Sequence, residues 1–206
     1  MQARTKSRGR PRSEEKHGQI MAAAMELFTR DGFEGTSVED IAVAAGVSKQ
    51  TVYSHFGCKE TLFGLAVSSK CKQSGVNQDE IDPAVAPAQM LPDIARRFIG
   101  LITSPEALRV HAVCTASAET HPDLGRIYFE QGPVQTVEAV AQYLEVQHEA
   151  GTLCVENPRS AAWQFLCMLK AEGQMRAQFN LKPQGQGDLD NYMDDCVSMF
   201  LRAYAA

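Results

Sequence analysis

The sequence lacks the features that define several large classes of protein. Among its 206 residues no run of about 18 is apolar, so we expect no membrane-spanning helix and no membrane partner. No apolar stretch follows the basic N-terminus, so we expect no secretory signal. The six cysteines form no Cys-x-x-Cys pair. We therefore expect a cytoplasmic protein with reduced thiols, namely Cys58, Cys71, Cys114, Cys154, Cys167 and Cys196.

Patterns for strands and for catalysis are also scarce. No stretch alternates apolar and polar residues for long, as a β-strand would, and no internal repeat is present. We find no phosphate loop, no paired nucleophile and base, and no dense carboxylate cluster in the C-terminal part. We therefore expect no enzyme and no cofactor, and keep an enzyme with a C-terminal pocket as an alternative.

Helical spacing is present instead, with helix start signals throughout. Ile20, Ala24 and Leu27 recur at helical intervals, and Asp31-Gly32 predicts the end of that helix. A cap followed by proline at Ser104-Pro105 and at Asn157-Pro158 predicts later starts, and Gly132-Pro133 predicts a break. The expected fold is all-α with about nine helices. Residues 74–89 are rich in Gly, Pro and acids, which predicts a boundary between a helix-turn-helix domain (13–73) and a larger effector-binding and dimerisation domain (74–206). We expect the first helix to begin at Ser13 and the residues before it (1–12) to form a basic disordered arm.

Charge is distributed unevenly along the chain. The formal net charge is −5, yet residues 1–60 carry a net charge of +1 and residues 61–206 one of −6. The arm holds Arg8, Arg10 and Arg12 with Gly9 and Pro11 between them. Such a segment can lie in a narrow minor groove, or it can be a solvated tail that adds non-specific affinity for DNA. Both interpretations stay open at this point.

Residues 36–62 carry the most specific pattern. Ser37 and Asp40 form a potential capping box for one short helix, Gly46 marks a tight turn, and Ser48 can cap a second helix. Small residues would let the two helices cross closely, and the candidates are Ala42, Ala44, Ala45 and Gly46. Val47 and Val52 would then pin the second helix from inside. The pattern indicates a helix-turn-helix, in which the second helix enters the major groove of DNA.

The second helix would display polar side chains suited to DNA. Gln50 can pair with adenine, and Lys49 can donate to guanine. Thr51 and Ser54 can serve bases or phosphates, and Tyr53 and His55 lie further along the helix, nearer the phosphates. Lys59 opposes the dipole of the helix it begins, so a phosphate nearby would explain it. A generic helical hairpin with a solvated polar face is the competing interpretation.

This region resembles the DNA-binding domain of the TetR family of transcriptional repressors. The resemblance covers about residues 14–67 and is carried by Ala22 to Phe28, Gly32-Phe33, Thr36-Ser37-Val38, Ile41-Ala42, Ala45-Gly46-Val47-Ser48, Thr51-Val52-Tyr53, His55-Phe56, Lys59-Glu60 and Leu62-Phe63. It implies phosphate contacts from Thr36, Ser37, Tyr53, His55 and Lys59, and base contacts from residues 49–51, Tyr53 and Ser54. Gly57-Cys58 departs from the charged or polar pair that the family often has.

The segment from Met90 to Asn180 is similar to an AefR-like C-terminal domain. This second resemblance says little about the ligand. The resemblance to the TetR family implies a homodimer on a palindromic operator, and the aromatic and apolar residues of the middle helices suit a small, hydrophobic effector that releases the protein from DNA. We expect the last two helices, about 159–180 and 188–205, to form the dimer interface, with Phe165, Leu166, Tyr192, Val197, Phe200 and Leu201 as candidate contacts. Candidate pocket residues are Phe98, Ile102, Leu108, His111, Phe129, Val137, Val140 and Trp163. Ordinary core packing is the alternative for each of them.

Three further alternatives concern regulation. His111 and Cys114 share a helical face and could bind zinc together with Glu119 or His121, although buried packing explains them more simply. Cys58 lies beside the second helix of the motif, where its oxidation could disturb DNA binding. An activator or a protein that bends DNA is the third alternative, and the arm has no apolar wedge residue that would favour bending.

Overall fold

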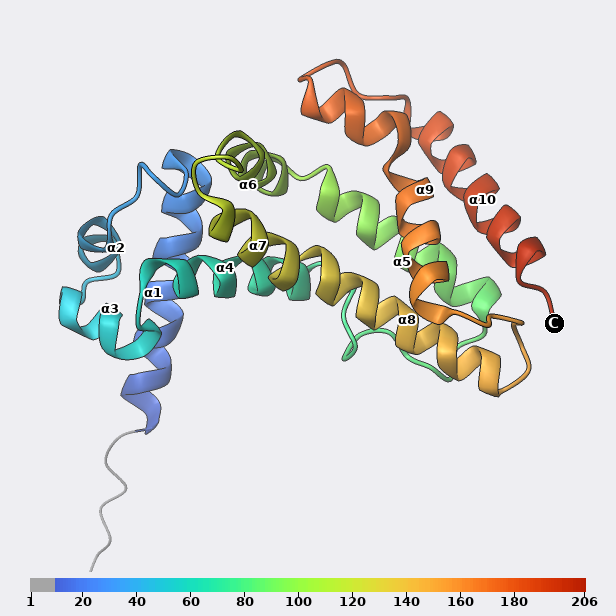
Figure 1. The fold of residues 1–206 in the computed structure, drawn as a ribbon, viewed down its shortest axis with the longest axis horizontal. Helices are drawn as coiled ribbons and strands as arrows, with labels where there is room; N and C mark the ends of the chain where they lie inside the picture. The colour runs from blue at the N-terminus through green and yellow to red at the C-terminus, as the bar shows by residue number, and fades with distance from the viewer. Residues whose placement is uncertain (1–9) are drawn as a thin grey trace, which may run out of the picture. The chain divides into compact units, whose positions relative to one another are not determined.

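The computed structural model describes residues 10–206, with side chains from Glu14 onward, and this part of the chain is all-α as expected (Figure 1). It contains ten helices, and its only β pairing is an isolated bridge between Leu153 and Ala205. The helices are α1 (Arg10–Asp31), α2 (Val38–Ala44), α3 (Lys49–Phe56), α4 (Lys59–Gln73), α5 (Pro87–Ile102), α6 (Pro105–Ala116), α7 (Pro122–Gln131), α8 (Pro133–Glu149), α9 (Pro158–Gln178) and α10 (Gln186–Ala203). None of these helices is long and apolar enough to cross a membrane.

The chain divides into two compact units between Ala66 and Val67, inside α4. This boundary lies before the one expected from the Gly- and Pro-rich segment 74–89. The first half of α4 buries Leu62 and Phe63 in the N-terminal unit. Its second half belongs to the C-terminal unit, where Lys70 Nζ lies 3.6 Å from Glu106 Oε2. The amino-acid composition predicted the boundary between the two units in the loop after α4, whereas the packing of side chains places it within α4.

The N-terminal unit is built around the apolar face of α1. Ile20 and Ala24 are fully buried, as their spacing predicts, and the ring of Phe28 packs edge-on against Phe63 with 5.3 Å between centroids. Gly32 ends α1 with φ 75°, in the left-handed region that favours glycine. We expected Ser13 to be the N-cap of this helix, but the helix begins three residues earlier, at Arg10. A proline, here Pro11, is tolerated in a first turn because its missing N–H would have no helical partner there.

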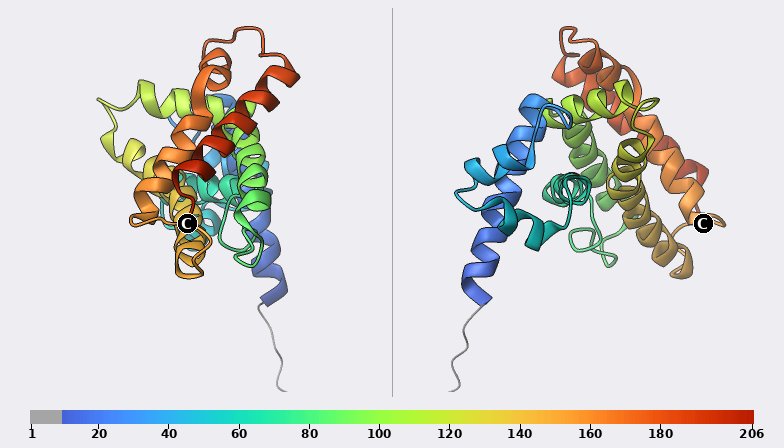
Figure 2. Two further views of the ribbon diagram at one scale, coloured as in Figure 1. Left: turned by 90° about the vertical axis from the view of Figure 1, so that its right-hand side faces the viewer. Right: turned by 60° about the vertical axis from the view of Figure 1, so that its left-hand side comes forward.

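The C-terminal unit packs α8, α9, α10 and α5 around one apolar core that includes Leu144 and Phe165. The helix starts predicted from cap-and-proline pairs are present: Ser104 Oγ accepts from Ala107 N–H, and Asn157 Oδ1 accepts from Ser160 N–H. The end of the chain returns to the connection between α8 and α9, where Cys154 N–H donates to the carbonyl of Tyr204 at 2.9 Å (Figure 2).

Helix α9 is interrupted near its C-terminal end. Ala171 has φ 19° and ψ −147°, which are not helical values. The segment after Ala171 leaves three large apolar side chains exposed, namely Met175, Phe179 and Leu181. Met175 lies in the last turns of α9, and Phe179 and Leu181 lie in the connection from α9 to α10.

Candidate nucleic-acid interface

The turn between α2 and α3 has the local geometry that the sequence predicts. Ser37 Oγ accepts from Asp40 N–H, and the Asp40 carboxylate accepts from Ser37 N–H, which completes the capping box. Gly46 has φ 65°, and Ser48 Oγ accepts from Thr51 N–H at 3.1 Å to cap α3. The two short helices are thus joined by a turn in which one residue adopts the left-handed backbone conformation, which glycine favours.

Helix α3 is anchored by two apolar residues one turn apart. Val52 is 2% exposed and Phe56 is 4% exposed, and both face the N-terminal core. Val47 is only half-buried. Of the small residues expected at the crossing, Ala42 is buried, but Ala44 is exposed. Ala44 therefore lies on the outer side of α2 and does not help the helices to approach.

The opposite face of α3 presents the predicted polar side chains together. Lys49, Gln50, Tyr53 and Ser54 are exposed and lie one helical turn apart in pairs, while Thr51 and His55 are half-buried. Some of the hydroxyls already have local partners. Ser48 Oγ and Thr51 Oγ1 lie 2.8 Å apart, and Ser54 Oγ donates to the Thr51 carbonyl at 2.8 Å. The amide of Gln50 makes no hydrogen bond with any residue in the described range, so it is available for a base edge.

Lys49 is held by a partner that the sequence analysis did not identify. Its ammonium forms an ion pair with Glu39 on α2, and it also lies 5.8 Å from the centroid of the Tyr53 ring. The hydrogen bond from Lys49 lowers the pKa of Glu39 and raises that of Lys49, so both groups are charged. Lys49 must therefore leave Glu39 before it can donate to a base.

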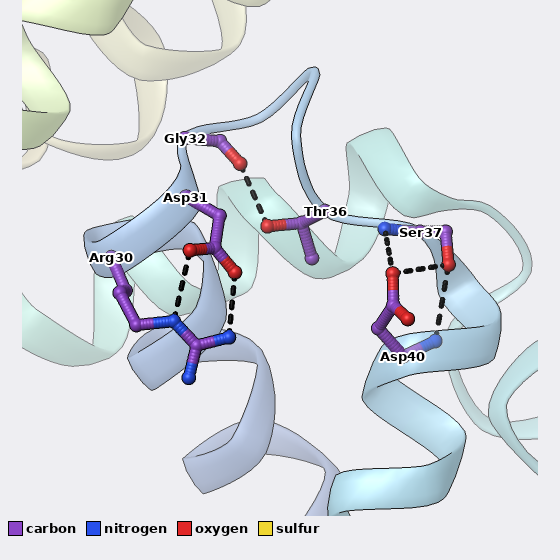
Figure 3. A network of polar contacts seen from close by, with 6 residues as sticks. All are labelled: Arg30, Asp31, Gly32, Thr36, Ser37 and Asp40. Atoms are coloured by element: carbon purple, nitrogen blue, oxygen red, sulfur yellow. Dashed lines mark hydrogen bonds and ion pairs between the residues drawn. The ribbon is translucent and has the colours of Figure 1, made fainter.

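Two residues before α2 differ in what they can offer to a phosphate (Figure 3). Thr36 is 1% exposed, and its hydroxyl donates to the carbonyl of Gly32 at 2.7 Å. We therefore remove the side chain of Thr36 from the expected phosphate contacts, since it holds the loop after α1. The hydroxyl of Ser37 is half-buried and donates to the Asp40 carboxylate at 2.6 Å. Ser37 thus acts first as the cap of α2.

Lys59 has a structural explanation that the sequence analysis missed. Its ammonium donates to the carbonyls of Phe33 at 2.9 Å and Thr36 at 3.1 Å, and it lies 4.0 Å from the centroid of the Phe33 ring. These contacts offset the unfavourable position of a cation at the start of a helix. A phosphate is not needed to explain this lysine, and its DNA contact stays a prediction.

Two further residues support the end of α3. The thiol of Cys58 accepts from Thr61 N–H at 3.4 Å and lies 3.1 Å from the Thr61 hydroxyl, so it takes the place of a polar cap at the start of α4. The ring of His17 on α1 stacks on Phe56, with 4.6 Å between centroids. The departure at Gly57-Cys58 could have indicated the cap, whereas nothing in the sequence pairs His17 with α3.

The basic arm can be located only in part. Arg8 lies outside the residues that the structure describes. Arg10 and Arg12 lie in the first turn of α1, although their side chains are not described. The two interpretations of the arm therefore stay predictions.

The expected pocket residues are divided between the core of the C-terminal unit and its surface. Phe98, Val137 and Val140 are buried in the main core of the C-terminal unit, with Ile102 and Trp163 packed against it. Leu108 and His111 are half-buried, and Phe129 is 48% exposed with its ring stacked on Trp163. A polar cleft of about 190 Å³ lies elsewhere and is lined by Ser68, Cys71, Lys72, Val76, Asn77, Gln78, Asp79, Gln135 and Thr136. It shares no residue with the expected set.

The expected dimer contacts are mostly core residues of one chain. Phe165, Leu166, Val197 and Phe200 are between 0% and 5% exposed and belong to the main core, so we remove them from the expected interface. Leu201 is half-buried and packs against that core. Tyr192 is 37% exposed, although its hydroxyl donates to the Met168 carbonyl at 2.8 Å. Most of these apolar residues of α9 and α10 thus pack helices together within one chain and are not exposed to a second chain.

The cysteine and metal alternatives receive little support. No group of three or more His, Cys, Asp or Glu side chains in the described part of the chain is arranged to hold a metal ion, so His111 and Cys114 are not joined by Glu119 or His121 in such a site. Burial raises the pKa of Cys71, and it raises that of Cys114 to about 12. These two thiols are therefore held in the unreactive protonated form.

Comparisons with known proteins agree with the geometry of both units. Residues 20–66 match the family of bacterial regulatory proteins of the tetR type, and residues 89–206 match the AefR-like transcriptional repressor C-terminal domain. The HTH-type transcriptional regulator YezE of Bacillus subtilis strain 168 is 25% identical over 181 residues, which cover 85% of this chain and 89% of YezE.

Two solved structures are similar over nearly the whole chain. A TetR-family transcriptional regulator from Mesorhizobium loti MAFF303099 is 32% identical with a TM-score of 0.78, over 95% of this chain and 99% of that one. The flavonoid-responsive regulator FrrA is 28% identical with a TM-score of 0.76, over 93% and 98%. With its helix-turn-helix, its AefR-like C-terminal domain and these relatives, the chain belongs to the TetR family of DNA-binding transcriptional regulators.

Proposed function

We propose that this protein is a homodimeric repressor that binds a palindromic operator and is released from it by a small aromatic ligand. The observation that carries the proposal is the exposed face of α3, where Lys49, Gln50, Tyr53 and Ser54 stand together opposite the buried Val52 and Phe56. Side chains of this kind on a short helix are suited to base edges in the major groove.

A dimer is needed because α3 is short. A helix of eight residues reaches only a few base pairs, which is too few to select one site in a genome. Two copies related by a two-fold axis read two half-sites in inverted orientation. The operator should therefore be palindromic.

The outer faces of α9 and α10 are the proposed dimer surface. These helices lie side by side (Figure 1), and most of the large exposed apolar side chains of the C-terminal unit belong to them or to their connection. They are Met175, Phe179, Leu181, Tyr192 and Met199. Exposed apolar groups gathered on one region are typical of protein interfaces. This surface replaces the buried residues that the sequence analysis had assigned to the interface.

A small aromatic compound is the proposed effector. FrrA responds to flavonoids, and its likeness to this chain covers both units. The C-terminal unit has half-buried apolar and aromatic groups on α6 and α7, among them Leu108 and Tyr128, which suit a planar apolar ligand. Release would follow if the ligand binds more tightly to the conformation that fits the operator poorly.

Selection of bound sequences from a random DNA pool tests the DNA-binding part of the proposal. We expect an enriched palindrome, with binding that falls steeply as salt rises because phosphates are neutralised. Gln50→Ala should weaken binding to the enriched site and relax the preference at one base pair of each half-site. Gln89→Ala, an exposed glutamine on α5, is the matched control and should leave both unchanged. No enriched sequence for the full-length protein would contradict the proposal.

An activator is the second candidate, since the geometry of α3 serves either role. A reporter placed behind the selected operator separates them in cells. Deleting the regulator should raise the reporter signal if the protein represses, and lower it if the protein activates.

A further inference from the structure

Helix α1 brings a histidine to the end of α3. The centroid of the His17 ring lies 6.1 Å from that of His55, which is in the last turn of α3. The two helices meet there because α3 ends beside the N-terminal half of α1 (Figure 1). Two imidazoles from different helices thus lie at one end of the candidate DNA-binding helix.

The ring of His17 is held by a stack. It lies on Phe56 with 4.6 Å between centroids and 28° between planes, and Phe56 is only 4% exposed. Because the packing of the core fixes Phe56, the imidazole that rests on it has few orientations. A stack covers a face of an imidazole and leaves uncovered the edge that carries the two nitrogens. His17 is accordingly exposed, although its ring is oriented.

Neither imidazole is used within the protein. Among the side chains that the structure describes, from residue 14 onward, none forms a hydrogen bond or an ion pair with His17 or His55. Water can satisfy these nitrogens in the free protein, and an oriented N–H loses little entropy when another acceptor replaces that water. Lys49 and Lys59, in contrast, already have partners in the chain. His17 is therefore a donor that is available to DNA.

The position of His17 on α1 indicates which part of DNA it would meet. Helix α3 is suited to the major groove, whose two sides are lined by phosphates. Helix α1 begins at Arg10, about two turns before His17, and the basic arm precedes it. Under the minor-groove interpretation of the arm, one sugar–phosphate backbone separates the arm from α3. A side chain on α1 between them meets phosphates rather than base edges.

We infer that His17 is a further DNA-binding residue, whose imidazole N–H donates to a backbone phosphate beside the end of α3. A phosphate oxygen is a charged acceptor, which makes such a hydrogen bond stronger than one between neutral groups. Contacts of this kind fix the orientation of a protein on the duplex. The contact from α1 would thus help to set the angle at which α3 enters the groove. This inference rests on the proposed contact of α3 with the operator and adds a contact from a second helix.

Two substitutions separate the N–H donor of His17 from its stack on Phe56. His17→Phe keeps a ring on Phe56 and has no donor, whereas His17→Gln keeps an N–H donor without the ring. We expect His17→Phe to weaken binding of the selected operator about tenfold in fluorescence anisotropy, as the loss of a hydrogen bond to a charged acceptor predicts. His17→Gln should weaken it less. Thermal unfolding checks that both variants are folded.

Gln19→Ala is the matched control on the same helix. Gln19 is exposed, and it lies two residues after His17, which places it on the other side of α1. This variant should bind the operator as tightly as the wild type. An equal loss from Gln19→Ala and His17→Phe would show that any change on α1 weakens binding, and the inference would be wrong.

Operators that carry one uncharged methylphosphonate test whether the acceptor is a phosphate. The modification is moved along each half-site, and binding of the full-length wild type is compared with that of His17→Phe. We expect one position at which the wild type loses affinity and His17→Phe loses none further, because the interaction is already absent. At the other positions the two proteins should lose affinity equally.

The remaining outcomes reject the inference. His17→Phe may not equal the wild type in operator affinity, and the two proteins may not show the same loss at every phosphate, if the contact exists. A changed base preference of His17→Phe with an unchanged phosphate profile would assign His17 to a base instead. Weaker binding by His17→Gln alone would assign it to the stack. In each case the operator still binds the wild type and the proposed function stands, whereas failure to select any operator rejects both.

Discussion

The ammonium of Lys59 connects the loop before α2 to the start of α4 within the N-terminal unit. Two carbonyl oxygens and the ring of Phe33 surround it. We expect Lys59→Met to lower the free energy of unfolding by about 1–2 kcal/mol, because two charge-assisted hydrogen bonds are lost and their acceptors are partly buried. Urea denaturation measures this change. Lys72→Met removes an exposed lysine from the same helix and should leave stability unchanged; equal losses in the two variants would contradict the structural role.

Under the proposed DNA contact of Lys49, Glu39 competes with the operator for the ammonium of Lys49. In the free protein these side chains form an ion pair at the surface. We expect Glu39→Gln to tighten operator binding at low salt by up to about fivefold, since the pair no longer has to be broken and such surface pairs are weak. Fluorescence anisotropy over a range of salt concentrations measures the change. Glu26→Gln, an exposed acid on α1, controls for the loss of one negative charge. Equal gains from both variants would show that the pair itself is unimportant.

At the scale of helices, the turn between α2 and α3 depends on one glycine. Gly46 has φ 65°, and no heavy atom lies within 4 Å of a Cβ placed there. A side chain would therefore meet no steric clash and only the strain of the left-handed conformation. We expect Gly46→Ala to destabilise the protein by about 1–2 kcal/mol. Thermal unfolding measures the change.

Gly18 provides the comparison for Gly46. It lies within α1 and also has open space around its Cβ position. Gly18→Ala should stabilise the protein by roughly 0.5–1 kcal/mol, because alanine favours a helix interior. Opposite signs for the two substitutions would confirm that the backbone conformation, not the available space, decides the effect. A neutral result at Gly46 would show that the turn relaxes.

The helix caps show how much of each element is encoded locally. Ser37 with Asp40, Ser48, Ser104 and Asn157 each cap the helix that the sequence predicts. These starts could be predicted because a cap involves residues only three positions apart. The start of α1 and the break at Ala171 could not. No strong local signal marks either position, so the surrounding packing decides them.

At the scale of the whole molecule, the proposed dimer uses the outer faces of α9 and α10. Met199 on α10 is 48% exposed. We expect Met199→Asp to convert the proposed dimer to a monomer, because a carboxylate in an apolar interface loses its hydration. Light scattering after size-exclusion chromatography measures the mass, and operator affinity should fall with it.

Val146→Asp is the control for assembly. Val146 is 41% exposed on α8, outside the proposed dimer surface, so this variant should remain dimeric. A monomeric wild type, or a dimer that tolerates the charge at Met199, would reject the interface on α9 and α10.

The exposed polar face of α3 could be predicted from the sequence, whereas the hydrogen-bond partners of single residues could not. Lys49, Gln50, Tyr53 and Ser54 share an exposed face because residues three or four apart on a helix are neighbours. Thr36 failed as a side-chain contact because its hydroxyl bonds Gly32 in the folded chain. Family resemblance places a residue in a motif, but the direction of its side chain depends on its packing.

The sequence by itself determined the all-α class, most helix ends and the polar face of α3, because these depend on residues three or four positions apart. Tertiary structure decided which partners the charged side chains of the N-terminal unit have within the chain. Lys49 meets Glu39 ten residues away, and Lys59 reaches carbonyls 23 and 26 residues away. It also decided that the rings of His111 and Tyr128 meet edge to face, since they come from two different helices and approach only when the chain has folded.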